Sequence, residues 1–207
     1  MAGWVARQAP KRRPAPPRGA SWGLLHSEAV RDAHVEMLTS SARTSPENEL
    51  AAVAAETVEG LDPYDAVVAL LRRVHSEVAY QTGSTGVSTS AAEAWRQRSG
   101  VCQDIAHVSL TVLREVGIPA RYVSGYLHPG GERAAIGETV RGESHAWIEA
   151  WLGEWWAFDP TNDVAVGERH VVVARGRDYA DVPPLKGVYS GGGSQSLGVV
   201  VEVTRLS

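Results

Sequence analysis

The sequence predicts an α+β fold in which N-terminal helices pack on an antiparallel β-sheet. Two observations support this prediction: apolar residues recur at helical spacing up to residue 116, and apolar and polar residues alternate from residue 120 onwards. Helices therefore come first and strands follow, which is typical of segregated α+β folds rather than of βαβ repeats. The chain has 207 residues, of which 43% are hydrophobic, and this suits one globular domain with a sizeable core.

The first 44 residues show the weakest hydrophobic periodicity of the chain. Residues 1–20 alternate proline with arginine, lysine, glycine and alanine, and we expect them to be disordered. Residues 21–44 show no clear periodicity and are too few for an independent domain. We therefore expect residues 1–44 to be a disordered or remnant N-terminal segment, and residues 45–207 to form the catalytic domain.

Four helices are predicted before residue 117. Pro46 and Pro63 stand at the first helical position of the first two helices. Ser90 and Glu93 form a capping box that opens the third. The fourth is apolar on most of its surface, which indicates burial, and it ends at Gly117. The expected ranges are 47–59, 63–79, about 90–98 and about 101–116.

Strands are predicted after residue 119, at 120–127, 143–152, 155–159, 170–174 and 197–204, with a glycine-rich loop over 128–142. Gly153 and Glu154 form a tight hairpin between the second and third strands. In such a hairpin, the numbers of paired residues sum to about 307, so His145 lies opposite position 162. Asp159 reaches His145 only through a bulge or a diagonal offset.

Cys102 is the only cysteine of the chain, and it stands at the start of the predicted buried helix. The partial positive charge and the unpaired N–H groups of a helix start favour a thiolate, and later an oxyanion. His145 and Asp159 follow downstream. A thiolate, a base and an orienting carboxylate are the groups that a cysteine nucleophile needs. Because a lone cysteine in an apolar helix is more often an inert core residue, the assignment depends on all three.

Other side chains compete for these roles. Asp163 is the main alternative to Asp159, and Asp178 is a weaker one. His107 follows Cys102 by five residues, about 500° around a helix at ~100° per residue, so it points away from the thiol and we expect it to pack.

Asp104 is expected to complement the dipole of the helix rather than to act as an acid. Tryptophans at alternating strand positions are more often core or sheet cover than the lining of an acyl-binding groove. The residues concerned are Trp147, Trp151, Trp155 and Trp156.

Composition narrows the partners and the compartment. The net charge of −4 gives no reason to expect nucleic acid or an anionic membrane as a partner. No run approaches the ~18 apolar residues of a membrane span, and residues 1–20 hold no signal-peptide core. One cysteine cannot form an intramolecular disulfide, so a reducing interior is the simpler compartment and we expect a cytoplasmic protein. We expect no cofactor and no metal; a metal site of His145, Asp159 and His170 is an alternative with poor spacing support.

Separated motifs resemble those of bacterial transglutaminase-like proteins. They occupy residues 100–104, 117–126, 144–147, 158–162, 169–171 and 176–183, in the order found in that family. The resemblance covers about residues 45–190 and implies a papain-like α+β fold, with the nucleophile on a helix packed against an antiparallel sheet. It also implies that Cys102 is the nucleophile, His145 the base and Asp159 the orienting group.

The activity that the resemblance implies is acyl transfer from a peptide or protein amide through a thioester on Cys102. Hydrolysis by a cysteine protease or amidase is favoured, because nothing in the sequence marks a site for a second amine substrate. Protein-glutamine transamidation and a non-catalytic binding module of the same fold are the alternatives. The oxyanion would rest on the Cys102 N–H and on a second donor, such as Gln81 or Trp95.

Overall fold

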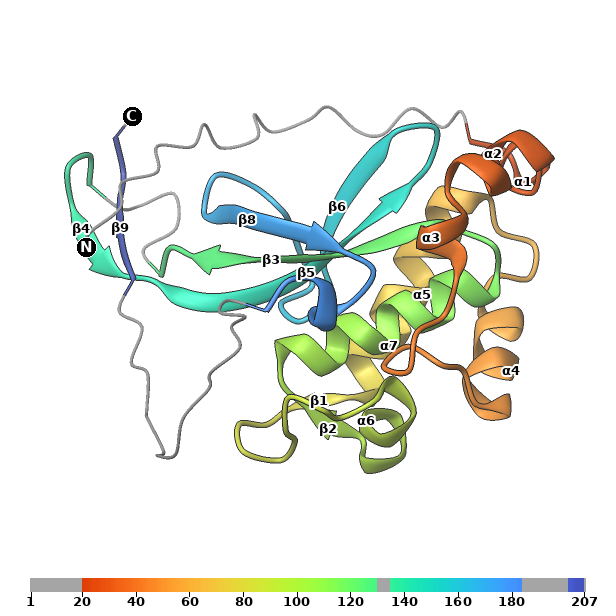
Figure 1. Ribbon diagram of the computed structural model, residues 1–207, viewed down its shortest axis with the longest axis horizontal. Coiled ribbons are helices and arrows are strands. Elements are labelled where there is room, and N and C mark those ends of the chain that lie inside the picture. The colour runs from red at the N-terminus through yellow and green to blue at the C-terminus, as the bar shows by residue number, and fades with distance from the viewer. Residues whose placement is uncertain (1–19, 130–134, 184–200, 207) are drawn as a thin grey trace, which may run out of the picture.

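The helices gather on one side of the molecule and the strands on the other, as Figure 1 shows. The structure is a computed structural model that describes residues 20–129, 135–183 and 201–206. Helices fill most of the first half of the described chain, and strands most of the second half. The predicted α+β class is therefore confirmed. The disorder expected at the start of the chain falls on residues 1–19, which lie outside the described residues.

The four helices predicted before residue 117 are present, and their ends differ from the expected ends by at most two residues. Three short helices precede them, where the sequence indicated no element. Each of the first two follows a serine whose side chain accepts a hydrogen bond from the first turn. The described helices are α1 (Trp22–Leu25), α2 (Glu28–Ala33), α3 (Val35–Leu38), α4 (Asn48–Thr57), α5 (Pro63–Glu77), α6 (Ala91–Gln97), α7 (Cys102–Glu115) and the 3-10 turn η2 (Tyr179–Asp181).

The strands at 120–127, 143–152, 155–159 and 170–174 are also found, within two residues of their expected ends. Alternating side chains predicted them, because one face of each strand is buried. The described strands are β1 (Ala79–Tyr80), β2 (Ser99–Gly100), β3 (Ala120–Leu127), β4 (Thr139–Arg141), β5 (Glu143–Trp151), β6 (Trp155–Asp159), β7 (Val164–Ala165), β8 (His170–Gly176) and β9 (Glu202–Thr204).

The prediction of a loop over residues 128–142 is wrong at its end, because this segment contains β4. This strand pairs with β9, and Val140 lies opposite Val203. Such distant pairing leaves no trace in local composition. The pair forms its own small sheet, so the strand expected at 197–204 does not join the main sheet through its described end. The part of that strand up to residue 200 lies outside the described residues.

The main sheet has the strand order β7-β6-β5-β3-β8, and each neighbouring pair is antiparallel. Helix α7 packs against β3 and β5, and α4, α5 and α6 pack around it. Burial on all sides explains why the helix is apolar around most of its surface. Its fully or almost fully buried apolar residues are Ile105, Ala106, Val108, Leu110, Val112 and Leu113.

The hairpin of β5 and β6 is shifted by one residue from the expected register. Ile148 pairs with Phe158, and Trp151 pairs with Trp155. Continuing this register places Asp159 opposite Trp147, on the same face as His145 and diagonal to it. In the expected register, Asp159 would fall on the other face, because a shift of one residue turns every side chain over. The diagonal offset is thus the arrangement that the structure adopts.

A bulge between β3 and β8 shifts the register of β8, the strand at the other edge of the main sheet. Ser124 pairs with Ala174, but Gly125 pairs with Val172, so β8 has one extra residue. Gly125 itself sits where a Cβ would lie 2.1 Å from the carbonyl oxygen of Val171 and 2.6 Å from the ring of Trp147. Only glycine fits this close approach.

Arg114 of α7 joins the segment before α4 and the residue that follows β8 to the core. Its buried guanidinium donates to the carbonyl oxygens of Met37 at 2.9 Å, Ala120 at 2.9 Å and Arg177 at 2.6 Å, and to the Thr44 hydroxyl at 2.9 Å. Burial lowers the pKa of Arg114 to about 10, still far above neutral pH. Residues 20–44 are therefore packed on the core, and the boundary placed at residue 45 stays a prediction.

Replacing Arg114 by methionine should lower the free energy of unfolding by about 3 kcal/mol, because several buried carbonyl groups lose their donor. Urea denaturation followed by circular dichroism measures the change. Arg73→Met is the matched control, since the exposed pair of Arg73 with Glu77 should contribute less than about 0.5 kcal/mol. Equal losses in the two variants would contradict the role given to Arg114.

Candidate active site

Cys102 occupies the first turn of α7, and Asp104 fixes how the chain enters that turn. One carboxylate oxygen of Asp104 accepts hydrogen bonds from the Val101 N–H at 2.8 Å and from the Thr85 hydroxyl at 2.5 Å. Asp104 is fully buried, and burial raises the pKa of its carboxyl group. A Cβ on Gly100 would lie 2.7 Å from the Cβ of Asp104, so glycine lets this turn close. Asp104 thus anchors the loop before α6 to the helix start.

His145 and Asp159 lie in direct contact. The Nε2 atom of His145 is 3.0 Å from Oδ2 of Asp159. The side chain of Cys102 lies close enough to the ring of His145 to raise the pKa of that ring. Because Nε2 faces Asp159, the other ring nitrogen, Nδ1, is left for the thiol. The structure therefore brings together the three residues that the sequence singled out.

The carboxylate of Asp159 is buried and surrounded by donors. Its Oδ1 accepts from the backbone N–H groups of Thr161 at 3.1 Å and Asn162 at 3.2 Å. Its Oδ2 lies 3.0 Å from His145 Nε2, 3.1 Å from His170 Nε2 and 2.8 Å from the amide nitrogen of Asn162. Donors on both oxygens favour the ionised carboxylate and fix its orientation.

These contacts shift two protonation equilibria in opposite directions. Burial alone would lower the pKa of His145, but its hydrogen bond to Asp159 and the nearby Cys102 side chain outweigh burial and raise that pKa to about 9. Burial alone would raise the pKa of Asp159, but hydrogen bonds from His145 and His170 hold it well below its usual range. Near neutral pH, His145 thus carries a proton and Asp159 does not.

His170 and Trp147 also belong to the site around Asp159. The sequence did not indicate that His170 contacts Asp159 or that Trp147 packs between the two histidines. The ring of Trp147 is buried between the two histidines: it stacks on His145 at 6.0 Å between ring centroids and meets His170 edge-on at 5.3 Å. The sequence indicated His170 as a possible metal ligand and as part of the motif at residues 169–171. That motif, at the start of a predicted strand, was the signal that could have pointed to its role.

The rival aspartates lie elsewhere. Asp163 is exposed, with φ of 48° in the left-handed region of a turn. Asp178 accepts from the N–H of Ala180 at 2.6 Å and caps the turn η2. His107 is fully buried and its Nε2 lies 3.2 Å from the N–H of Tyr179, so it packs as expected.

Of the two candidate oxyanion donors, Trp95 is excluded by its contacts. It is buried, and its indole N–H donates to Glu49 at 2.9 Å. Gln81 lies beside the segment that leads into α7, because its backbone N–H donates to the carbonyl oxygen of Gly100 at 2.8 Å.

The remaining tryptophans of the sheet serve as cover. Trp151 packs on the ring of His34 with 4.7 Å between centroids, and Trp155 lies 4.0 Å beneath the guanidinium of Arg121. Trp156 packs against the hydrophobic core. These contacts fit packing, the role favoured by the sequence, rather than an acyl-binding groove.

The three side chains of the metal alternative do come together. The candidate ligand atoms of His145, Asp159 and His170 lie within 4.8 Å of one another. Nδ1 of His170 lies 3.2 Å from the N–H of Gly167 and accepts from it, so the ring carries its hydrogen on Nε2, the atom that faces Asp159. A nitrogen that donates cannot bind a metal at the same time, so the cluster fits a hydrogen-bond network better than a metal site.

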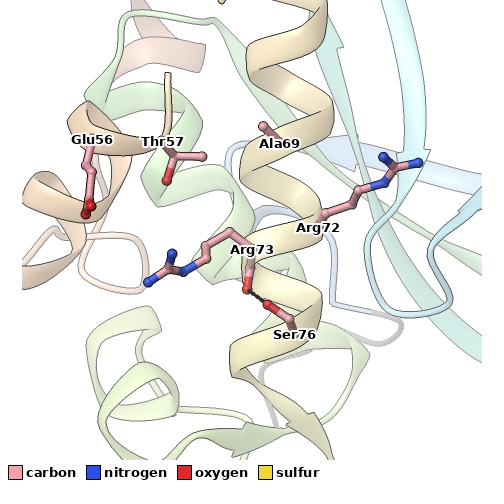
Figure 2. Close-up of a pocket in the computed structure, with 6 residues that line it drawn as sticks. All are labelled: Glu56, Thr57, Ala69, Arg72, Arg73 and Ser76. Carbon is pink, nitrogen blue, oxygen red and sulfur yellow. Dashed lines mark hydrogen bonds between the residues drawn. The ribbon is translucent and has the colours of Figure 1, made fainter. Parts of the chain in front are cut away.

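A pocket of about 510 Å³ opens between α4 and α5, away from these residues. Figure 2 shows that Arg73 extends toward Glu56 and Thr57, whereas Arg72 points to the other side of α5. Its lining contains none of the three candidate catalytic residues. Separately, none of the helices in the described part of the chain is long and apolar enough to cross a membrane.

Comparison with known proteins finds one family. A model described as the transglutaminase-like superfamily matches residues 51–160. An uncharacterized protein of Mycobacterium leprae is 51% identical over 187 residues, which cover 90% of this chain and 67% of that protein. A protein-glutamine gamma-glutamyltransferase of Pseudomonas aeruginosa is 38% identical over 115 residues, which cover 50% of this chain and 16% of that enzyme.

Among solved structures, a candidate cysteine protease of Cytophaga hutchinsonii superimposes with a TM-score of 0.67 and 29% identity. The match covers 83% of this chain and 56% of that one. A relative from Mycobacterium bovis is matched over only 45% of its length. The chain thus spans at most about two thirds of the length of these relatives, and only 16% of the Pseudomonas aeruginosa enzyme.

His145 should titrate near pH 9, well above its ordinary value of 6.5, because Asp159 and Cys102 stabilise its protonated form. An NMR titration of the imidazole carbon-bound proton measures this pKa, and Asp159→Asn should lower it. Since the folded pKa exceeds the unfolded one, the stabilisation from protonated His145 is complete below pH 6.5 and is lost as pH rises through about 9. A midpoint at or below 6.5 in the unmodified protein would contradict the network.

Proposed function

The chain belongs to the transglutaminase-like superfamily, and from this premise we propose that it is a thiol enzyme that transfers acyl groups from amide bonds. Cys102 is the nucleophile, His145 the base and Asp159 the orienting carboxylate. The observation that carries the proposal is the hydrogen bond between His145 and the buried Asp159, with the side chain of Cys102 near enough to His145 to raise its pKa. Nucleophile, base and orienter in contact are the signature of an activated cysteine.

In the first half of the reaction, the Cys102 thiolate attacks the carbonyl carbon of an amide. A carbon–sulfur bond forms, and the carbonyl electrons move to the oxygen. The intermediate then collapses: the carbon–nitrogen bond breaks, His145 gives its proton to the leaving amine, and a thioester remains on Cys102. Asp159 keeps the imidazole oriented during this transfer.

In the second half, an acceptor attacks the thioester while His145 removes its proton. The carbon–sulfur bond breaks and Cys102 leaves as the thiolate. The oxyanion of each intermediate rests on the backbone N–H of Cys102, which has no acceptor within the first turn of α7. Gln81 is the proposed second donor, since Trp95 is engaged with Glu49.

Hydrolysis, with water as the acceptor, is the proposed outcome on a peptide or protein amide. The likeness to a candidate cysteine protease over 83% of this chain supports it. Transamidation of glutamine is the second candidate, because the Pseudomonas aeruginosa relative is a protein-glutamine gamma-glutamyltransferase. A non-catalytic module is disfavoured, since the nucleophile, the base and the carboxylate are all present and in contact.

The cytoplasmic location stays a prediction that rests on the single cysteine of the chain. Fractionation of cells that produce the full-length protein would test it. Recovery of the protein outside the cytoplasm would contradict it.

Cys102→Ala should abolish amide turnover, by at least about a thousandfold, because no other side chain can form the thioester. Release of amine from a casein-derived peptide mixture measures turnover, and circular dichroism checks that the fold is kept. Turnover that survives in the variant would refute the assignment. Turnover that EDTA removes from the unmodified protein would instead favour the metal alternative.

Asp159→Asn should lower kcat by at least about a hundredfold, because the buried carboxylate that orients and charges His145 is lost. Asp163→Asn is the matched control: the residue is exposed, and asparagine tolerates its left-handed turn position. Steady-state kinetics on the same peptides compare the two. Similar losses in both variants would remove the distinction between the two aspartates.

A further inference from the structure

Both ring nitrogens of His170 have a defined partner. Nδ1 accepts a hydrogen bond from the Gly167 N–H at 3.2 Å, and Nε2 lies 3.1 Å from Oδ2 of Asp159. A nitrogen that accepts from an N–H carries no hydrogen, so a neutral ring has its hydrogen on Nε2. His170 therefore donates to the same oxygen that contacts His145.

We propose that His170 is a positioning residue, a neutral imidazole that holds the Asp159 carboxylate in the orientation in which it accepts from His145. The proposal rests on the proposed function and adds a fourth side chain to the same site. His170 does not touch the thiol path directly: its contact is with Asp159, and its effect on His145 passes through that carboxylate.

Burial makes the donor hard to replace. The side chains of His170 and Asp159 are both 0% exposed. The ring of Trp147 packs edge-on against His170, at 5.3 Å between centroids. Water cannot take over the hydrogen bond without opening this packing, so loss of the donor leaves a buried carboxylate oxygen less well satisfied.

The fold places His170 here through the bulge between β3 and β8. Beyond the bulge, Gly125 pairs with His145 of β5 and with Val172 of β8, and Leu127 pairs with His170. His170 and His145 therefore lie on one face of the sheet. Without the extra residue, His170 would turn to the opposite face, away from Asp159.

Three side chains share the Oδ2 atom of Asp159, and this affects where the proton between Asp159 and His145 lies. The negative charge of Asp159 is spread over hydrogen bonds to His145, His170 and Asn162, so the proton between the carboxylate and His145 stays on the imidazole. From α5, the ring of His75 approaches the same turn, 3.1 Å from the carbonyl oxygen of Pro160. Cys102 lies beyond His145, on its other side.

Two substitutions separate positioning from packing. The amide nitrogen of glutamine reaches the place of Nε2, so His170→Gln keeps a donor to Asp159. The asparagine side chain ends near the place of Nδ1, so His170→Asn can still accept from Gly167 but does not reach Asp159. Both side chains are polar and smaller than histidine, so a purely structural role would affect them alike.

We expect His170→Asn to lower kcat on the casein-derived peptides by about tenfold to a hundredfold, with KM changed by less than about threefold. The acid limb of the kcat/KM profile should move to higher pH, because Asp159 loses a donor that stabilises its ionised form. His170→Gln should stay within about fivefold of the unmodified protein, with the limb unmoved. Equal activity or equal impairment in the two variants would overturn the proposal.

A second readout does not need turnover. The Nε2 proton of His145 should give a downfield NMR resonance in the unmodified protein and in His170→Gln, and should exchange faster in His170→Asn. If this pattern appears in a protein without amide turnover, the positioning role stands and the proposed function fails. If turnover is present and the resonance is the same in all three proteins, the positioning role fails alone. Should His170→Asn not fold, His170→Leu, which has no donor, takes its place in both measurements.

Discussion

The buried carboxylate of Asp159 is the interaction on which the rest of the site depends. Its two oxygens accept hydrogen bonds from β5, from β8 and from the turn that follows β6, so it joins three segments of the main sheet. These donors keep Asp159 ionised, and an ionised Asp159 keeps a proton on His145. The charged imidazole lies beside Cys102 at the start of α7, the end of the helix that carries a partial positive charge.

The register of the β5–β6 hairpin and a one-residue bulge between β3 and β8 bring these side chains together. The β5–β6 hairpin runs one residue away from the expected register, which turns Asp159 to the face of His145. The bulge opposite Gly125 turns His170 of β8 to that same face of the sheet. Trp147 fills the space between the two histidines, and the missing side chain of Gly125 makes room for its ring. The site therefore depends on sheet register as much as on residue identity.

The sequence predicted what local patterns encode. Helix starts at Pro63 and Ser90 are signalled by neighbouring residues, and the buried helix after Cys102 is visible in its apolar composition. The pairing of β4 with β9 could not be predicted, because it joins segments far apart in the chain. The choice between Asp159 and Asp163 depends on the pairing of the β5–β6 hairpin, because a shift of one residue would turn Asp159 to the other face of the sheet. The role of His170 depends on the bulge between β3 and β8. Such features arise from packing in the whole sheet, so they became visible only in three dimensions.

In the proposed reaction, this network makes Cys102 the carrier of an acyl group. The most direct measurement is the intact mass of the protein after acid quenching of its reaction with peptides that carry carboxamide side chains. The account predicts a mass increase located on Cys102, removed by hydroxylamine as expected for a thioester, and absent from Cys102→Ala. An adduct that resists hydroxylamine, or one that persists in Cys102→Ala, would contradict it.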